Sequence, residues 1–447
     1  MEYLDVVIVG TGPAGLGAAF GLLDGADGWH SSKARAEVAA SRASPSILLL
    51  DRNSFSSGGL RNDCKMNFTW PIGFPAGVWD EATARGYLDR VEDFLKPSIL
   101  EKRNVSVYAK RAERLGTSLL EVRQAHLGTD GGLELIKRLM AELTRRGAAF
   151  GLDERVLAVA PTKGAERGWI VTTDKRELGC RNLVIAPGRG GFSFLQDQMA
   201  TLGIHYTDNV VDIGIRVETR EERYSIVQDY YDPKFLFPLK TRTFCTNSRA
   251  AHVVQEKYED NEGKPWYSVN GHAWSASRPA NGLANFALLR TVTLTQPLAS
   301  GQAYARMLGV QASLLGGGAP IVQRVGDFRL GKRSKASGLN GDLYDFEPTL
   351  ASATPGDLSL ACPGKILEAL WKAMKTLDTI VPGILHPSTL MYYPEIKLYA
   401  NRPVFMDANF QALPRLWLVG DGAGTSRGIT AAWASGLRAA DGIRSQT

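Results

Sequence analysis

The 447-residue sequence contains only four cysteines, Cys64, Cys180, Cys245 and Cys362, and they lie far apart. No CxxC or CxxxxC pair occurs, and no histidine stands at ligand spacing from any of them. Zinc sites and redox-active disulfides are built on such pairs. The spacing therefore argues against both, and we expect no metal site.

Long hydrophobic runs are also missing. No apolar run approaches the ~18 residues of a membrane span. The N-terminus has no basic segment before its first apolar run, as a cleaved signal peptide would have. These absences predict a cytoplasmic protein without a membrane segment, and 44% hydrophobic content over this length predicts two or three domains.

Charge of one sign does not dominate, because 52 basic and 46 acidic residues leave a net charge of +6. Part of that excess is local: five basic residues fall within twelve positions beside one acid, Asp327. They are Arg324, Arg329, Lys332, Arg333 and Lys335. A solvated loop, an anionic substrate site and a nucleic-acid surface remain as alternatives for this cluster.

A glycine-rich motif close to the N-terminus is the strongest feature that the sequence does contain. Residues 4–9 form an apolar run of buried parallel-strand type, and Gly10-Thr11-Gly12-Pro13-Ala14-Gly15 follows at once. Gly10 permits a tight turn, Gly12 lets the backbone approach a pyrophosphate, and Gly15 lets the helix predicted over 16–23 pack closely. The free amides of that helix then face the phosphates.

An acidic residue should end the next strand of such a unit. The apolar run 47–50 is followed by Asp51, which is placed to accept the ribose hydroxyls. A polar excursion over 25–46 explains its distance from Gly15. The order of strand, turn, helix, strand and acid predicts a Rossmann-like dinucleotide-binding domain.

A second motif near the C-terminus discriminates between cofactors. Leu416-Trp417-Leu418-Val419 predicts another strand, and Gly420-Asp421-Gly422-Ala423-Gly424 follows it. A simple nicotinamide dehydrogenase has no need of this element, whereas FAD has a ribityl chain that must be held. We therefore expect FAD, with Asp421 as a ligand of its ribityl chain.

Together the two motifs resemble those of FAD-dependent oxidoreductases with two-dinucleotide-binding-domain architecture. The resemblance implies that Asp421 binds the ribityl hydroxyls and that the helix after Gly428 and Ile429 points its N-terminus at the flavin pyrimidine. It also implies that Lys65 faces the flavin and that the backbone of Gly188 contacts the cofactor. The other predicted cofactor-binding residues are Pro13, Ala14, Arg52, Gly59, Val156 and Gly420.

A closer resemblance, to a family of mostly uncharacterised FAD-dependent dehydrogenases, is carried by motifs spread over most of the chain. They are His126-Leu127-Gly128-Thr129-Asp130, Asp212-Ile213-Gly214-Ile215-Arg216-Val217-Glu218, Arg242-Thr243-Phe244-Cys245, Asn270-Gly271, Gly326-Asp327-Phe328 and Gly422-Ala423-Gly424-Thr425-Ser426-Arg427-Gly428.

The pattern along the chain predicts an α/β protein with a discontinuous Rossmann-like FAD-binding domain and an inserted, sheet-rich α+β substrate domain. We expect residues 1–211 to form the first part of the FAD-binding domain, with a small β-meander at about 154–180 and an irregular loop over 54–78. β-Branched and aromatic residues between turn signals mark 212–350 as the substrate domain. Residues 351–447 should supply a linker helix and the return to the FAD-binding domain.

Candidate catalytic residues are few. His272, after Asn270-Gly271, is suited to take a proton from an amine or a hydroxyl near neutral pH, the alternative being a turn histidine bonded to the backbone. Glu395, in a tyrosine-rich stretch, is a candidate for orienting a cationic substrate, the alternative being an exposed carboxylate paired with Lys397.

Three functional classes follow. The first is an FAD-dependent dehydrogenase or oxidase that takes a hydride from a small polar metabolite, amines included. The second is an NAD(P)H-dependent flavin reductase or monooxygenase, although only one GxGxxG is present, since Gly316-Gly317-Gly318 follows a predicted helix instead of opening one. The third is a flavoenzyme that modifies a nucleotide or a base in nucleic acid, held by the basic cluster.

Overall fold

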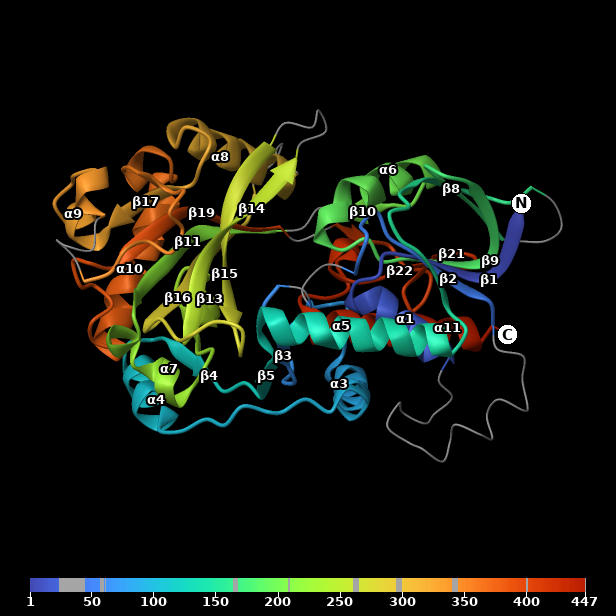
Figure 1. Ribbon diagram of the computed structural model, residues 1–447, viewed down its shortest axis with the longest axis horizontal. Helices are drawn as coiled ribbons and strands as arrows, with labels where there is room; N and C mark the ends of the chain where they lie inside the picture. Colours follow the sequence, from blue (N-terminus) through green and yellow to red (C-terminus); the bar gives the residue numbers. More distant parts are fainter. Residues whose placement is uncertain are drawn as a thin grey trace. The chain divides into compact units, whose positions relative to one another are not determined.

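The computed structural model describes residues 1–23, 45–56, 60, 62–163, 168–207, 210–259, 265–294, 300–339, 345–398 and 401–446. The chain divides into two compact units, which Figure 1 draws with the chain coloured from end to end. Unit 1 comprises Met1–Ile99, Arg123–Asn209 and Tyr399–Thr447, and unit 2 comprises Leu100–Val122 and Val210–Leu398. The predicted α/β fold class, with one discontinuous domain and one inserted sheet-rich domain, is confirmed.

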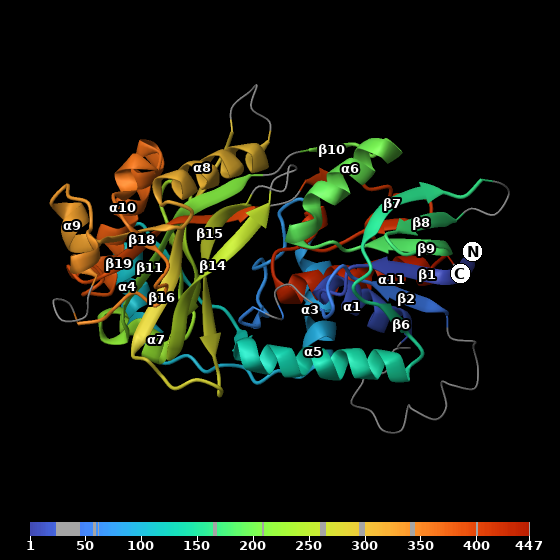
Figure 2. The same cartoon turned by 45° about the horizontal axis from the view of Figure 1, so that its top comes forward.

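Unit 1 is built on a parallel sheet with the order β6-β2-β1-β9-β22. Its strands are β1 (Glu2–Val9), β2 (Ile47–Leu50), β6 (Ala149–Gly151), β9 (Glu177–Ile185) and β22 (Leu416–Leu418). Figure 2 shows β9, β1, β2 and β6 side by side. The sequence order 3-2-1-4-5 of these strands is that of a Rossmann domain, as the first motif predicted.

Antiparallel strands extend this sheet. They are β7 (Val156–Pro161), β8 (Trp169–Thr173) and β21 (Gln411–Leu413), of which β7 pairs with β8, β8 with β9, and β21 with β22. The predicted meander is present. Its last strand, β9, continues beyond residue 180 to Ile185, because it pairs with β1 over this length.

Helices cover both faces of the unit 1 sheet. They are α1 (Pro13–Leu23), α3 (Glu81–Leu95), α5 (Gly128–Arg145), α6 (Phe192–Leu202) and α11 (Ile429–Arg444). Val6 and Ile8 of β1 point to a core shared with α1, α3, α5 and α11, whereas Val7 and Val9 point to a core shared with α6 and the meander. This alternation is the period of two that a strand buried on both faces shows.

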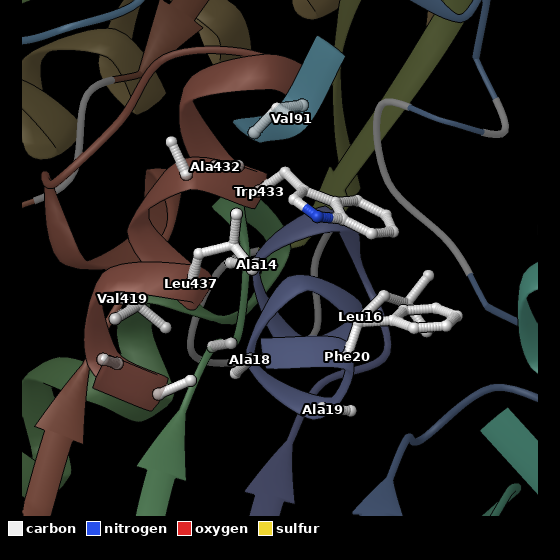
Figure 3. Packing of buried hydrophobic residues seen from close by; sticks show 14 of the residues in the cluster. Ala14, Leu16, Ala18, Ala19, Phe20, Val91, Val419, Ala432, Trp433 and Leu437 are labelled. Atoms are coloured by element: carbon white, nitrogen blue, oxygen red, sulfur yellow. The ribbon is translucent and has the colours of Figure 1, made fainter. Parts of the chain in front are cut away.

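Small residues bring α1 and α11 into close contact. A Cβ added at Gly17 would lie 2.6 Å from the carbonyl oxygen of Trp433, and one added at Gly436 would lie 2.0 Å from that of Ala14. Figure 3 shows Phe20 of α1 beside Trp433, and the two rings stack with centroids 5.8 Å apart. These contacts pack the first half of α11 against α1.

Residues 54–78 contain one regular element that the sequence did not reveal. β3 (Lys65–Asn67) pairs with β5 (Gln124–His126), so that Lys65 faces His126 in the register. A three-residue strand has no periodicity to detect, and only its distant partner defines it. A second short pair in unit 1 is β10 (Tyr206–Thr207) with β20 (Arg402–Pro403).

Unit 2 is built on a mostly antiparallel sheet in the order β18-β17-β19-β11-β16-β13-β12-β4, with β14 and β15 attached through β16. The strands are β4 (Ser118–Leu120), β11 (Val211–Arg220), β12 (Lys234–Phe237), β13 (Thr241–Asn247), β14 (Ala250–Glu259), β15 (Pro265–Trp274), β16 (Leu283–Val292), β17 (Ile321–Arg324), β18 (Thr354–Pro355) and β19 (Leu390–Leu398). Its helices are α4 (Val105–Arg114), α7 (Ile226–Asp229), α8 (Gly301–Leu315), α9 (Val325–Arg329) and α10 (Gly364–Ile380).

The unit boundaries differ from the predicted 212–350 and 351–447. β4 pairs with β12, which brings residues 100–122 into unit 2. β19 pairs with β11 and β17, so unit 2 extends to Leu398 and also contains α10. Both boundaries are set by strands that pair over long sequence separations. Such pairing cannot be predicted from local composition. No helix in the described ranges is long and apolar enough to cross a membrane.

Candidate cofactor site and polar network

The predicted cofactor motifs meet at one edge of the unit 1 sheet. β1 runs into Gly10, β2 into Asp51, β9 into Gly188 and β22 into Gly420-Asp421. These four strands are parallel, so their carboxyl ends lie at the same edge. Open α/β sheets bind their ligands at this edge.

Two glycines of the first motif stand where no other residue fits. Gly10 has a φ of +103°, and a Cβ there would lie 2.2 Å from the carbonyl oxygen of Ala186. A Cβ at Gly15 would lie 1.9 Å from the carbonyl oxygen of Gly10. The turn therefore presses against both the end of β9 and its own helix. α1 begins at Pro13, so the amides of Ala14 and Gly15 lie in its first turn, which is open to an anion.

Asp51 ends β2 as predicted, but protein donors surround its carboxylate. Oδ2 accepts from the amide and the hydroxyl of Thr11, at 3.0 and 2.7 Å, and Oδ1 accepts from the amide and side chain of Asn53, at 3.0 and 2.9 Å. A carboxylate offers about four lone-pair sites. Asp51 thus ties the glycine-rich turn to the end of β2, a role that was not predicted from the sequence. Nothing in the sequence marks Thr11 and Asn53 as its partners except that they lie close to the motif.

The turn after β22 is equally constrained. The amide of Gly420 donates to the hydroxyls of Thr425, at 2.8 Å, and Ser435, at 3.1 Å. Asp421 accepts from the Ser426 hydroxyl at 2.7 Å and from the Gly428 amide at 3.1 Å. The second interaction anchors Asp421 at the N-terminus of α11.

Burial is the largest influence on the Asp421 carboxyl and raises its pKa above the ordinary value. The positive charges of Arg189 and Arg427 and the two hydrogen bonds act in the opposite direction. Arg189 follows Gly188 directly, and a Cβ at Gly422 would lie 2.4 Å from the carbonyl oxygen of Gly188. The turns after β9 and β22 therefore pack together, and they bring Arg189 and Arg427, which the sequence analysis missed, close to Asp421.

Lys65 lies on the strand next to the first turn of α11. The amide of Asn67 on the same strand donates to the Thr430 hydroxyl at 3.0 Å. The Lys65 ammonium lies 3.2 Å from Asp63, and its side chain is only 10% exposed. The indole of Trp79 donates to the carbonyl of Thr425 at 2.7 Å, which further fixes this loop against the second motif.

The remaining predicted cofactor-binding residues occupy varied positions. Arg52 is exposed, and its guanidinium would lie 3.0 Å from a Cβ at Gly190. Val156 begins β7 and is buried. Gly59 lies outside the described residues, as does most of the excursion predicted over 25–46.

Glu395 lies in β19 of unit 2, where its carboxylate is fully buried in an ion-pair network. Arg216 donates to both its oxygens, at 2.7 and 3.0 Å, and the Lys397 ammonium lies 3.0 Å away. Arg216 also donates to the side-chain oxygens of Asn285, at 2.6 Å, and Asn270, at 3.4 Å. This corrects the prediction that Glu395 orients a substrate, because protein cations occupy both oxygens and neither is exposed.

Gly271 makes room for this network. A Cβ there would lie within 2.3 Å of Arg216, Asn247 and Asn285 side-chain atoms. The Asn270-Gly271 and Arg216 motifs are therefore explained together as parts of one buried polar layer within the sheet, and their wide separation in sequence concealed that connection.

His272, the other catalytic candidate, lies in β15 and not in a turn. It is half-buried and faces His252 of β14 in the register. The ring of Trp274 lies 5.1 Å from His252 and 6.0 Å from His272, centroid to centroid. Burial, followed by the positive charge of Arg278, lowers the pKa of His252.

The sequence matches no protein-family model and no curated protein. It is similar in structure to the p-nitrophenol 4-monooxygenase PnpA of Pseudomonas putida DLL-E4, at 12% identity and a TM-score of 0.41, with 100% of this chain and 82% of that one covered. It is also similar to the anhydrotetracycline hydroxylase OxyS of Streptomyces rimosus, at 12% identity and a TM-score of 0.37, with 96% and 57% covered.

A third similar structure is a glycerol-3-phosphate dehydrogenase of Bacillus halodurans complexed with FAD, at 11% identity and a TM-score of 0.38, with 100% of this chain and 65% of that one covered. The chain thus spans less than two thirds of the hydroxylase and of this dehydrogenase. The site is defined by the strand order and the contacts of this chain.

Proposed function

We propose that the chain is an FAD-dependent oxidoreductase that removes a hydride from a small polar metabolite, with amines as the first class to test. The convergence of Gly10, Asp51, Gly188 and Asp421 at the carboxyl edge of the parallel sheet carries the proposal. A single nucleotide motif would suit many dinucleotides. The second element, with Asp421 at the start of α11, favours a cofactor that has a polyol between its phosphate and its ring.

The residues present fit FAD. The glycines of the turn at Gly10 to Gly15 carry no side chain, and the first turn of α1 would offer amides to a pyrophosphate. Asp421 would offer acceptors to ribityl hydroxyls, and the positive N-terminal end of α11, a 16-residue helix, would stabilise negative charge on the flavin pyrimidine. When bound, FAD supplies a two-electron acceptor for the substrate hydride.

The chain's own groups would assist in two ways. Lys65, whose side chain is 10% exposed and lies 3.2 Å from Asp63, would hold a cation near the start of α11, where Asn67 of the same strand donates to Thr430, and would favour negative charge on the flavin. His272 is the candidate general base, since an imidazole accepts a proton near neutral pH. All four cysteines lie in the described part of the chain and none forms a disulfide there, which supports a reducing compartment, the cytoplasm, as the place of action.

Analysis of the purified protein tests the proposal. Heat-released cofactor, identified by chromatography, should be FAD at about one molecule per chain, and an anaerobic absorption spectrum should show oxidised flavin that neither NADPH nor NADH bleaches. A panel of amines and hydroxylated metabolites should then contain a reductant. Rapid bleaching by NADPH or NADH would assign the chain to the reductase or monooxygenase class instead, and failure to bind FAD in reconstitution would refute the cofactor assignment.

A further inference from the structure

The basic cluster in unit 2 lies on a loop that the fold holds in place. Arg324 is fully buried and donates to the carbonyls of Gly338, at 2.5 Å, and Ser388, at 2.6 Å, so it belongs to the core and not to a charged surface as the sequence suggested. The buried Ser334 donates to Asp327 at 2.5 Å and accepts from the Arg324 amide at 2.9 Å. These contacts fix the loop between α9 and η4 (Ala336–Gly338) from both ends.

The remaining cations of the cluster surround a concave surface. A cavity of about 410 Å³ is lined by Asp327, Lys332, Arg333, Lys335, Ser337 and Gly338. Among the described lining residues the one acid is Asp327, which accepts a hydrogen bond from the Ser334 hydroxyl. The backbone on which the cations stand is also tied down, because the side chain of Gln323 donates to the carbonyl of Lys332 at 2.8 Å.

The three cations have no acidic partner. Within the described residues, Lys332, Arg333 and Lys335 make no ion pair, although exposed lysines elsewhere in unit 2, such as Lys372 with Glu368, do. Three cations against the one carboxylate of Asp327 leave an excess of positive charge on a fixed loop, and the resulting local potential attracts anions. They can also give charge-assisted hydrogen bonds without first breaking a salt bridge.

From this arrangement we infer that the cavity binds a compact phosphate-type anion, either pyrophosphate or the phosphate group of a small ester. Among the described residues that line the cavity none is an apolar or aromatic side chain, which favours a polar anion over a hydrophobic substrate or stacked bases. Two ammonium groups, a guanidinium and the Ser337 hydroxyl match the many acceptor oxygens of a phosphate. The site is formed by unit 2 alone and does not depend on the proposed flavin chemistry.

Calorimetric titration of the full chain tests the inference with four probes: inorganic phosphate, pyrophosphate, a sugar phosphate and a short DNA duplex. The pocket variant is Lys332→Ala combined with Lys335→Ala. Its matched control is Lys110→Ala combined with Lys375→Ala, which removes two exposed lysines of unit 2 that lie on α4 and α10, outside the cavity. Both double variants lower the net charge equally.

We expect the wild type and the control to bind pyrophosphate alike and the pocket variant to bind it at least tenfold more weakly. Tight binding of the sugar phosphate would identify a phosphate ester as the ligand. Binding of pyrophosphate without binding of the sugar phosphate would identify the free anion. Equal weakening in both double variants, DNA binding without phosphate binding, or no anion binding at physiological salt would overturn the inference. If the pocket variant does not fold, thermal melting of the wild type tests the inference instead. At equal ionic strength, the Tm in pyrophosphate must be higher than the Tm in chloride.

Discussion

Arg216 and Glu395 form a bidentate ion pair with 0% exposure of either side chain, at Nε–Oε2 2.7 Å and Nη2–Oε1 3.0 Å. The two residues stand on adjacent strands, β11 and β19, although 179 positions separate them. Asn285, Asn270 and Lys397 complete the network. A carboxylate that looked available in the sequence is therefore part of the structural core of unit 2.

Glu395→Gln should destabilise unit 2. The substitution leaves Arg216 and Lys397 buried without their counter-charge, and breaking a buried pair in this way costs about 3 kcal/mol or more of unfolding free energy. Urea denaturation measures the loss. Glu368→Gln is the control, because its ion pair with Lys372 is exposed to solvent and should contribute little to stability. Equal effects of the two substitutions would contradict the structural role.

Gly15→Ala should abolish FAD binding. The new Cβ would overlap the carbonyl oxygen of Gly10 at 1.9 Å, so the turn must open and α1 must move. We expect a stability loss of about 2 kcal/mol or more in addition. Flavin content and thermal melting measure both effects. Gly364→Ala is the control: nothing lies within 4 Å of its added Cβ, and the protein should keep its FAD and its stability. Retention of FAD by Gly15→Ala would refute the proposed site.

Asp421→Asn should weaken FAD binding about tenfold or more, because hydroxyl donors bind a charged acceptor more strongly than a neutral one. In the apo-protein, by contrast, we expect the same substitution to increase stability relative to wild type at higher pH. Burial raises the folded-state pKa of Asp421 above its unfolded value. Its favourable contribution is thus full below the unfolded pKa and is lost as pH rises through the folded pKa.

The neutral asparagine escapes this loss, so the apo form of Asp421→Asn should gain stability relative to wild type as the pH is raised. Denaturation at several pH values, with the exposed Asp197→Asn of α6 as the control, tests the sign. A variant that loses stability relative to wild type at higher pH would show that the hydrogen bonds to Ser426 and Gly428 outweigh burial.

His272→Asn should slow reduction of the flavin by the substrate about 100-fold. The rate of reduction should also no longer change with the ionisation of a group that titrates near neutral pH. Anaerobic stopped-flow absorbance measures the rate once a reductant is found. His252→Asn alters the paired position in the strand register and should change the rate little. Comparable losses in both variants would show that the pair is structural.

Short-range signals made the cofactor unit predictable. A buried strand followed by Gly10 to Gly15 allows few conformations, because Gly10 needs a positive φ and Gly15 has no space for a Cβ. Helix α1 (Pro13–Leu23) also covers the predicted range 16–23, since a buried helix repeats its pattern over three turns.

The strand-turn-helix units and the position of Asp421 could be predicted locally, because their signals lie within a few residues of one another. Four features could not: the contact of Asp51 with Thr11, the burial of Arg324, the pairing of Glu395 with Arg216 and the place of residues 100–122 in unit 2. Each of these depends on a partner far along the chain. A side chain's charge is visible in the sequence, but its burial and its counter-charge arise only when distant strands pair.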